Sequence, residues 1–170
     1  LLDQVKSRSE NVLDWAAIQS PSDSLQVDYQ TLKDPEGCYE QFSRLVIGKL
    51  NGGLGTSMGC EGPKSLIKVK GDRTFLDLIV EQVRELNATW DANIPLLLMN
   101  SFYTEKETNN FVGNINFPLI AFTQNKFPRL SAGSLLPLNL EEWGDQAWYP
   151  PGHGDFYNCI AEQGILRSLI

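Results

Sequence analysis

Histidine and cysteine are scarce in this chain. The 170 residues contain one histidine, His153, and three cysteines, Cys38, Cys60 and Cys159, which are odd in number and far apart. A zinc site takes about four such ligands at short spacing, and a secreted disulfide scaffold needs cysteines in pairs. The sequence therefore predicts no zinc site, and reduced thiols in a cytoplasmic protein are the simplest interpretation.

Long apolar runs and an excess of positive charge are also missing. No stretch approaches the roughly 18 apolar residues that would span a membrane, and the first residues, LLD, lack the basic and apolar regions of a secretory signal. The net charge of −7 and the pI near 4.7 argue against nucleic acid or an anionic membrane as a partner. Because the first residue is leucine, we expect the chain to have been cut or processed.

Short apolar runs alternate with helical patterns along the chain. The runs at 45–50, 94–99 and 119–122 are typical of buried strands, and 65–69 of a shorter extended piece. Apolar residues recur at helical spacing after position 74, and further helices are predicted to begin near 104 and 155. This alternation predicts an α/β fold of three layers, in which helices cover both faces of a mostly parallel or mixed, Rossmann-like sheet. Ligands then bind at the carboxyl ends of the strands.

Capping residues predict where the helices begin. Thr74 with Asp77, and Thr104 with Glu107, have the spacing of a capping box. Asp155 is the predicted cap of a last helix that runs to about residue 164.

Two other features set helix limits. Gly113 is expected to end the helix that starts at 104. Before residue 19, apolar residues at helical spacing predict an amphipathic helix over 1–18. The sequence SPSDS at 20–24 then ends it.

Glycine and positive charge are concentrated between residues 44 and 73. The apolar run at 45–50 leads into a loop with glycines at 52, 53, 55, 59 and 62. Glycine lets the backbone turn its N–H groups toward a ligand at close range, and such groups bind anions. Against Glu61 and Asp72 the segment has six basic residues, a balance of about +4 (six minus two): Arg44, Lys49, Lys64, Lys68, Lys70 and Arg73. A phosphate-bearing ligand is the predicted partner.

Two familiar phosphate-binding motifs do not fit this loop. The dinucleotide fingerprint requires G-x-G-x-x-G, but counting from Gly53 the third glycine position holds Met58. The P-loop requires a glycine directly before Lys-Ser/Thr, whereas Pro63 precedes Lys64. The loop is therefore glycine-rich without belonging to either class, and a turn that binds nothing is the alternative reading.

Three stretches, in this order, resemble one enzyme family. The loop LNGGLGTSMGCEGPKS at 50–65 is similar to the nucleotide-binding loop of eukaryotic-type UTP–glucose-1-phosphate uridylyltransferases, also called UDP-glucose pyrophosphorylases. QNKFPR at 124–129 and WYPPGHGD at 148–155 agree with the same family. The resemblance covers roughly residues 40–170, and three ordered motifs are far more specific than one glycine-rich loop.

The resemblance implies a nucleotidyltransferase. Its reaction transfers the uridylyl group of UTP to glucose 1-phosphate and gives UDP-glucose and pyrophosphate. The family uses Mg²⁺, whose aspartate ligand is expected beyond this chain, so no metal ligand is predicted here. The implied partners are UTP, glucose 1-phosphate, UDP-glucose and pyrophosphate, with no nucleic acid and no membrane, and the implied location is cytoplasmic.

The resemblance also implies which residues act. Lys64 matches the family's catalytic lysine, which contacts the phosphates as a compact cation. Gln124 matches the glutamine that pairs with uracil, because a primary amide offers both a donor and an acceptor. His153 matches the residue near the sugar phosphate. The residues implied in nucleotide binding are Leu50, Asn51, Gly52, Gly53, Gly55, Lys64, Gln124 and Gly152.

The sequence departs from the family pattern at a few positions. Gly48 stands in the first strand where the family usually has a bulkier apolar residue, which either weakens the strand or marks a close approach. Thr123 and Lys126 replace the Asn and Gln common beside the uracil-binding glutamine.

The chain also lacks the segments that follow in the family. We expect an N-terminal helical segment at 1–43, and at 44–170 the first half of the nucleotide-binding catalytic domain. The remainder would be supplied by another chain or by residues outside this sequence. The alternatives are a pyrophosphorylase for another UDP-sugar, against which Met58 argues, and a non-catalytic nucleotide-binding homologue or fragment.

Overall fold

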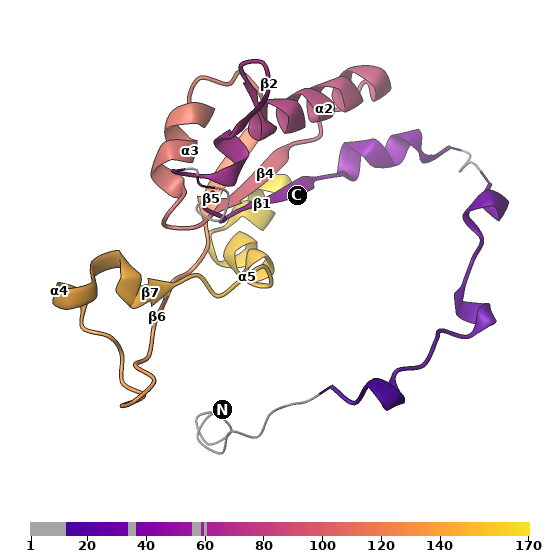
Figure 1. Ribbon diagram of the computed structural model, residues 1–170. Helices are drawn as coiled ribbons and strands as arrows, with labels where there is room; N and C mark the ends of the chain where they lie inside the picture. Colours follow the sequence, from indigo (N-terminus) through magenta and orange to yellow (C-terminus); the bar gives the residue numbers. More distant parts are fainter. Residues whose placement is uncertain (1–12, 34–36, 56–58, 60) are drawn as a thin grey trace. The chain divides into compact units, whose positions relative to one another are not determined.

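The computed structural model describes residues 13–33, 37–55, 59 and 61–170 (Figure 1). Its contacts divide the chain into two units, Leu1–Glu36 and Gly37–Ile170. The described residues of the first unit form three single-turn 3-10 helices, η1 (Trp15–Ala17), η2 (Asp23–Leu25) and η3 (Tyr29–Thr31). None of the residues described in this unit is buried.

The amphipathic helix predicted for 1–18 is wrong over the part that the structure describes. Between 13 and 18 the chain forms only η1, where the Asp14 side chain accepts a hydrogen bond from the Ala16 N–H at 3.0 Å. Leu13 and Trp15 are 58% and 76% exposed. A short helix of this kind is stable only when its apolar face is packed, and here that face meets solvent. Residues 1–12 lie outside the described residues.

The second unit is built on a parallel sheet. Its strands are β1 (Ile47–Asn51), β2 (Lys68–Lys70), β3 (Arg73–Thr74), β4 (Leu96–Asn100), β5 (Leu119–Thr123), β6 (Phe127–Pro128) and β7 (Trp148–Tyr149). Its helices are η4 (Cys38–Arg44), η6 (Lys64–Leu66), α2 (Phe75–Trp90), α3 (Glu105–Val112), α4 (Leu140–Trp143), η7 (Gly144–Ala147), α5 (Asp155–Glu162) and α6 (Ile165–Leu169). Within the described ranges, no helix is long and apolar enough to cross a membrane.

The three strands predicted from the sequence form one sheet, but the burial predicted for the first is wrong, because Gly48, Lys49 and Leu50 of β1 are exposed. The order of the sheet is β1-β4-β5, and both pairs are parallel. The register places Asn51, Asn100 and Thr123 side by side where the three strands end. The two-stranded sheets β2-β3 and β6-β7 are antiparallel. The piece predicted as extended at 65–69 begins instead with the 3-10 turn η6, closed by the Leu66 N–H bonding to the Pro63 carbonyl at 3.0 Å, and becomes a strand only at Lys68.

Helices cover both faces of this sheet, as predicted. Every residue of β4 is buried, and alternate side chains point to opposite faces. Leu96 and Leu98 pack against α2, with α3 beside them, while Leu97 and Met99 pack against α5 and α6. Figure 1 shows α2 and α3 on one side of the strands and α5 on the other. The fold is therefore a three-layer α/β arrangement with a fully buried central strand.

Of the three predicted side-chain caps, one is confirmed and two are wrong. Thr74 and Asp77 form the full capping box of α2. Thr104 precedes α3 but makes no side-chain cap, because its hydroxyl bonds elsewhere. Asp155 is the first residue of α5 and does not cap it; Gly154 holds the cap position, and the Asp155 carboxylate accepts hydrogen bonds from Asn125.

Glycines mark the ends of α3 and α5. Gly113 ends α3, as predicted, with right-handed backbone at φ −57°. The single last helix predicted to about 164 is two helices, because Gly164 turns the chain with φ +72° between α5 and α6. A left-handed residue of this kind stops one helix and lets the next begin.

Gly48, in the middle of β1, marks a close approach rather than a weak strand. A Cβ atom added there would lie 2.7 Å from Cζ of Phe156 on α5. The Phe156 ring is itself held against Phe122 of β5, with 5.6 Å between ring centroids. The missing side chain at 48 is what lets α5 lie against β1.

Lys126 ties the arm at 127–149 to the sheet. Its ammonium lies 4.9 Å from the ring centroid of Trp148 and 5.7 Å from that of Phe102. Phe102 follows β4, Lys126 follows β5 and Trp148 begins β7, so three loops meet at one cation.

Candidate functional site

The site lies where the three parallel strands end. Gly52 follows β1, Ser101 follows β4 and Gln124 follows β5, and the Gln124 N–H donates to the Asn100 carbonyl at 2.9 Å. This is the edge at which open α/β sheets bind ligands. The first two sequence motifs, at 50–65 and 124–129, therefore converge in space.

The glycine loop is closed like a hairpin. The Gly55 N–H donates to the Gly62 carbonyl at 2.8 Å, and the Lys64 N–H donates to the Gly53 carbonyl at 3.0 Å. Gly62 has φ +88°, a conformation that side chains rarely adopt. Residues 56–58 and 60, and with them Met58 and Cys60, lie outside the described residues. The closure brings Lys64 back beside the start of the loop.

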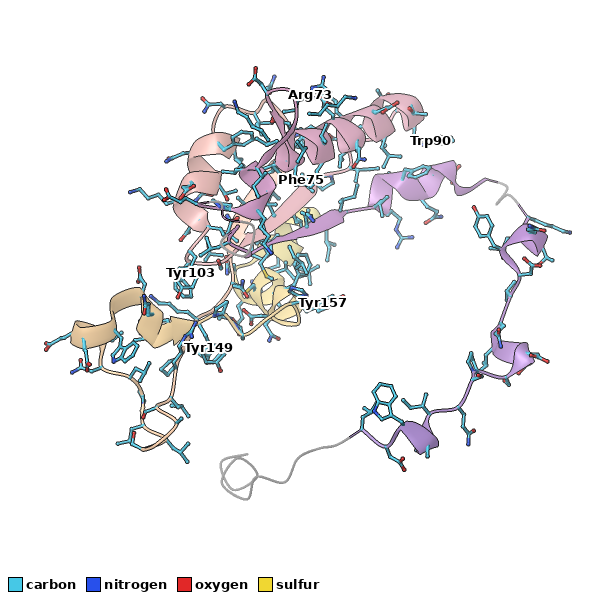
Figure 2. All side chains as sticks on the ribbon, in the orientation of Figure 1. Arg73, Phe75, Trp90, Tyr103, Tyr149 and Tyr157 are labelled. Atoms are coloured by element: carbon cyan, nitrogen blue, oxygen red, sulfur yellow. The ribbon has the colours of Figure 1, made fainter. Side chains whose placement is uncertain are left out.

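Lys64 opens onto a cavity of about 390 Å³. It is exposed, and its Cδ lies 3.6 Å from the position of a Cβ on Gly53. A flexible cation at this place can reach a phosphate seated over the loop. The lining residues are Lys49, Leu50, Asn51, Gly53, Lys64, Ser65, Phe75 and Ile79; Figure 2 shows Phe75 at the start of α2.

Two of the six basic residues near the loop are paired at the surface. Lys68 bonds to Asp72 at 2.8 Å and Arg73 bonds to Glu81 at 2.8 Å. All four side chains are more than 40% exposed, so these pairs contribute little to stability. Lys64 differs from both because it lines the cavity.

Gln124 faces Gly52 across the end of the sheet. Its Nε2 atom lies 2.6 Å from where a Cβ on Gly52 would be. The side chain is 8% exposed, and its Oε1 is buried without a hydrogen-bond partner among the described residues. A buried carbonyl oxygen without a partner is costly. A bound group that donates a hydrogen bond to Oε1 would remove that cost.

His153 lies at a second cavity, of about 610 Å³, on the other side of β1, and Gly152 directly precedes it in the chain. His153 is exposed and lines this cavity together with Leu50, Tyr157 and Phe156; Figure 2 shows Tyr157 on α5. Gly152 has φ +112° and its carbonyl accepts from the N–H at the start of α5. The structure thus places His153 and Lys64 at different cavities, and Leu50 lines both.

Asp155 joins the second motif to the third. Its carboxylate accepts from the Asn125 N–H at 2.8 Å, from the Asn125 side-chain amide at 3.1 Å and from the Cys159 thiol at 3.2 Å. Burial alone would raise the pKa of Asp155, but the hydrogen bonds from Asn125 and Cys159 outweigh it and lower the pKa below its ordinary value. Burial, with the Asp155 bond, raises the pKa of Cys159 to about 11, so this thiol is neutral and unreactive at pH 7.

We expect Asp155→Asn to destabilise the chain by about 2 kcal/mol at pH 7, because an amide cannot accept from all three donors. The lowered pKa means that the carboxylate's stabilisation is present above the ordinary value of about 3.9 and is lost as the pH falls through the lower folded-state pKa. Urea unfolding at pH 7 and pH 3 measures both effects. The difference in free energy of unfolding between the unchanged chain and Asp155→Asn should be smaller at pH 3 than at pH 7. An equal difference at both pH values would contradict the proposed role of the carboxylate.

A buried polar network beneath the loop was not predicted. The Asn51 amide donates to Asn100 Oδ1 at 2.7 Å and to Thr108 Oγ1 at 3.0 Å. Ser101 and Thr104 bond to the backbone of the loop. The available signal was the run of polar residues directly after the buried strand at 94–99. Thr104 was instead assigned to a capping box.

Comparison with known proteins identifies one family. The family model described as UTP–glucose-1-phosphate uridylyltransferase matches residues 2–170. The enzyme of that name from Saccharomyces cerevisiae is 44% identical over 170 residues, covering 98% of this chain and 34% of the relative. The one from Solanum tuberosum is 44% identical over 166 residues, covering 93% and 35%. The chain thus spans about a third of the length of these curated relatives.

Solved structures agree. A mutant UDP-glucose pyrophosphorylase from Leishmania major, in complex with UDP-glucose, has a TM-score of 0.79 at 30% identity, covering 99% of this chain and 36% of that one. The UDP-glucose phosphorylase from Trypanosoma brucei has a TM-score of 0.66 at 37% identity, covering 76% and 29%. The three motifs occur in the family's order, and the family model matches almost the whole sequence. This chain therefore belongs to the UTP–glucose-1-phosphate uridylyltransferase family.

Proposed function

We propose that this chain supplies the UTP-binding half of an enzyme that transfers a uridylyl group to glucose 1-phosphate. The observation that carries the proposal is the buried Gln124 amide, which faces Gly52 with its Oε1 unpartnered among the described residues. The uracil edge has an N–H that can donate to Oε1 and a carbonyl that can accept from Nε2. Gly52 leaves room for the base because it has no Cβ.

Lys64 is the proposed phosphate contact. The reaction brings two anions together, a nucleoside triphosphate and a sugar phosphate, so the protein must hold them in line and offset their repulsion. The backbone N–H groups of Gly52 and Gly53 and the ammonium of Lys64 would serve the nucleotide, with Leu50, Asn51, Gly55 and Gly152 around it. His153, an exposed donor at the neighbouring cavity, would serve the sugar phosphate.

The rest of the catalytic domain would complete this site. The cavity of about 610 Å³ beside β1 is lined by Val46, Gly48 and Leu50 and by residues of α5. A further segment, on the same or another chain, would cover it. Residues 1–43 would form the N-terminal segment, and residues 44–170 would form the first half of the catalytic domain. A cytoplasmic location is part of the same proposal.

Mg²⁺ is the expected cofactor of the family, but the residues described here do not form its site. No group of three or more His, Cys, Asp or Glu side chains within the described ranges could hold a metal ion, and Mg²⁺ prefers carboxylate oxygens and phosphates. Its protein ligand would have to come from outside the described residues.

Calorimetric titration with UTP and with CTP, in the presence of Mg²⁺, tests the proposal. UTP should bind more tightly than CTP, because cytosine presents the opposite donor and acceptor pattern to Gln124. Gln124→Ala should remove that preference, and Lys64→Ala should weaken both nucleotides by about tenfold or more, the value of a charged hydrogen bond. Lys70→Ala is the matched control, since Lys70 is an exposed lysine of β2 away from the cavity.

The outcomes separate the alternatives. Equal binding of UTP and CTP by the unchanged chain would contradict the role of Gln124. Equal losses for Lys64→Ala and Lys70→Ala would make Lys64 an ordinary surface charge. If the full-length protein binds UTP but produces no UDP-sugar from any sugar 1-phosphate, a non-catalytic nucleotide-binding homologue is favoured. Turnover with a sugar 1-phosphate other than glucose 1-phosphate would favour a pyrophosphorylase for another UDP-sugar.

A further inference from the structure

Two buried hydroxyl groups reach the backbone of the glycine loop from below. The Thr104 hydroxyl donates to the Asn51 carbonyl at 2.7 Å, and the Ser101 hydroxyl donates to the Gly52 carbonyl at 2.9 Å. Both side chains are completely buried. Each therefore has a fixed place from which to hold a carbonyl.

Fixing the direction of a carbonyl also fixes the direction of the next N–H group. The peptide bonds are trans, so the C=O of one residue and the N–H of the next point in opposite directions within one plane. Thr104 thus sets the direction of the Gly52 N–H, and Ser101 sets that of the Gly53 N–H. Both N–H groups point away from the buried hydroxyls.

A pair of glycines needs such a restraint more than other residues do. Glycine has the widest range of backbone conformations, and ordering a loop at the moment of binding reduces affinity. Ser101 and Thr104 also hold each other, because the Ser101 N–H donates to Thr104 Oγ1 at 3.0 Å and the Thr104 N–H donates to the Ser101 carbonyl at 3.0 Å. They form a rigid pair at the end of β4.

We propose that Ser101 and Thr104 are positioning residues that pre-orient the Gly52 and Gly53 N–H groups for the nucleotide. The inference rests on the proposed function for its ligand, but the ordering of the two glycines is a property of the free protein. Donors fixed before binding act without reorganisation. The pair acts through the loop and does not touch the nucleotide.

Nitrogen-15 relaxation of the free protein tests the ordering directly. In the unchanged chain the Gly52 and Gly53 amides should have order parameters near 0.85, about the value of rigid backbone. Thr104→Val should lower that of Gly52, Ser101→Ala that of Gly53, and the double variant both, to below about 0.6. Thr104→Ser restores the hydroxyl and should restore the order parameter of Gly52.

UTP titration of the same variants supplies the second readout. Thr104→Val and Ser101→Ala should each weaken binding by about tenfold, and Thr104→Ser by much less. The control is Asn87→Ala, which removes the two hydrogen bonds between Asn87 and Ile94 at the opposite end of β4. It should lower the free energy of unfolding by a similar amount while leaving the glycine amides and UTP affinity unchanged.

Three results would overturn or redirect the inference. Unchanged order parameters in the double variant would show that the hydroxyls do not restrain the loop. An equal loss of affinity in Asn87→Ala would mean that reduced stability lowers binding, and not the lost orientation of the glycine N–H groups. If the folded, unchanged chain does not bind UTP, the proposed function fails for this chain, and the order parameters still decide the role of Ser101 and Thr104.

Discussion

Gly52→Ala should weaken UTP binding by at least tenfold, and it should change the free energy of unfolding by less than about 1 kcal/mol. The new Cβ would lie 2.6 Å from Gln124 Nε2, so the amide must move, whereas the next atom, Ser101 Cβ, is at an ordinary 3.5 Å. Gly52 does not have a positive φ, so alanine meets no backbone strain. The substitution displaces one side-chain end and leaves the fold intact.

A double variant shows whether the effect passes through Gln124. Once Gln124→Ala has removed the amide, Gly52→Ala should cost little further affinity, because effects on a shared contact do not add. Gly133→Ala is the control: a Cβ there would meet nothing within 4 Å. Wild-type affinity in Gly52→Ala, or a full second loss in the Gln124→Ala background, would contradict the proposed place of the base.

The parts of the fold that follow from local pattern were predictable. The run at 94–99 became β4 because a strand buried on both faces is apolar throughout, and the run at 119–122 became β5, which is partly buried. The capping box at Thr74 depends on residues only three apart, and it formed. The convergence of Gly52 and Gln124 followed from parallel strands, whose carboxyl ends share one edge.

The parts that depend on distant contacts were not predictable from spacing. Thr104 has the sequence of a helix cap, but the Asn51 carbonyl, 53 positions earlier, takes its hydroxyl. Asp155 likewise bonds to Asn125, 30 positions earlier, instead of capping α5. In both cases a local bond competed with a buried one, and an unsatisfied buried partner is the costlier loss. No pattern in a single sequence reveals which partner wins.

Over the described residues 13–18, the predicted helix fails for a related reason. Helical spacing describes a face that could be buried, and it does not supply a surface to bury that face against. Leu13 and Trp15 are largely exposed. Amphipathic spacing was therefore a sound guide for α2, whose Leu76 and Val80 meet β4, and a poor one where no partner surface is present among the residues described in that unit.

Gly48→Val should destabilise the chain by about 1–3 kcal/mol, the usual cost of forcing extra atoms into a close contact. On strand preference alone the change would be favourable, since valine suits strands and glycine weakens them. The close approach of Phe156 makes the change destabilising instead, because a Cβ at 48 would lie 2.7 Å from Phe156 Cζ and 3.2 Å from Cε2. Moving the ring away would disturb its contacts with Phe122 and Tyr157, which lie at centroid distances of 5.6 and 5.7 Å.

A double-mutant cycle measured by urea unfolding identifies Phe156 as the cause. Phe156→Leu removes the Cζ atom and on its own should cost less than about 1.5 kcal/mol, as a hydrophobic swap that leaves most of the volume. In that background Gly48→Val should cost at least about 1 kcal/mol less than in the unchanged chain, because the two residues share one contact. Gly133→Ala again serves as the neutral glycine control. If the valine costs the same with and without the phenylalanine, the glycine in β1 is there for a reason other than the approach of α5, and its absence of a side chain becomes a weakness of the strand after all.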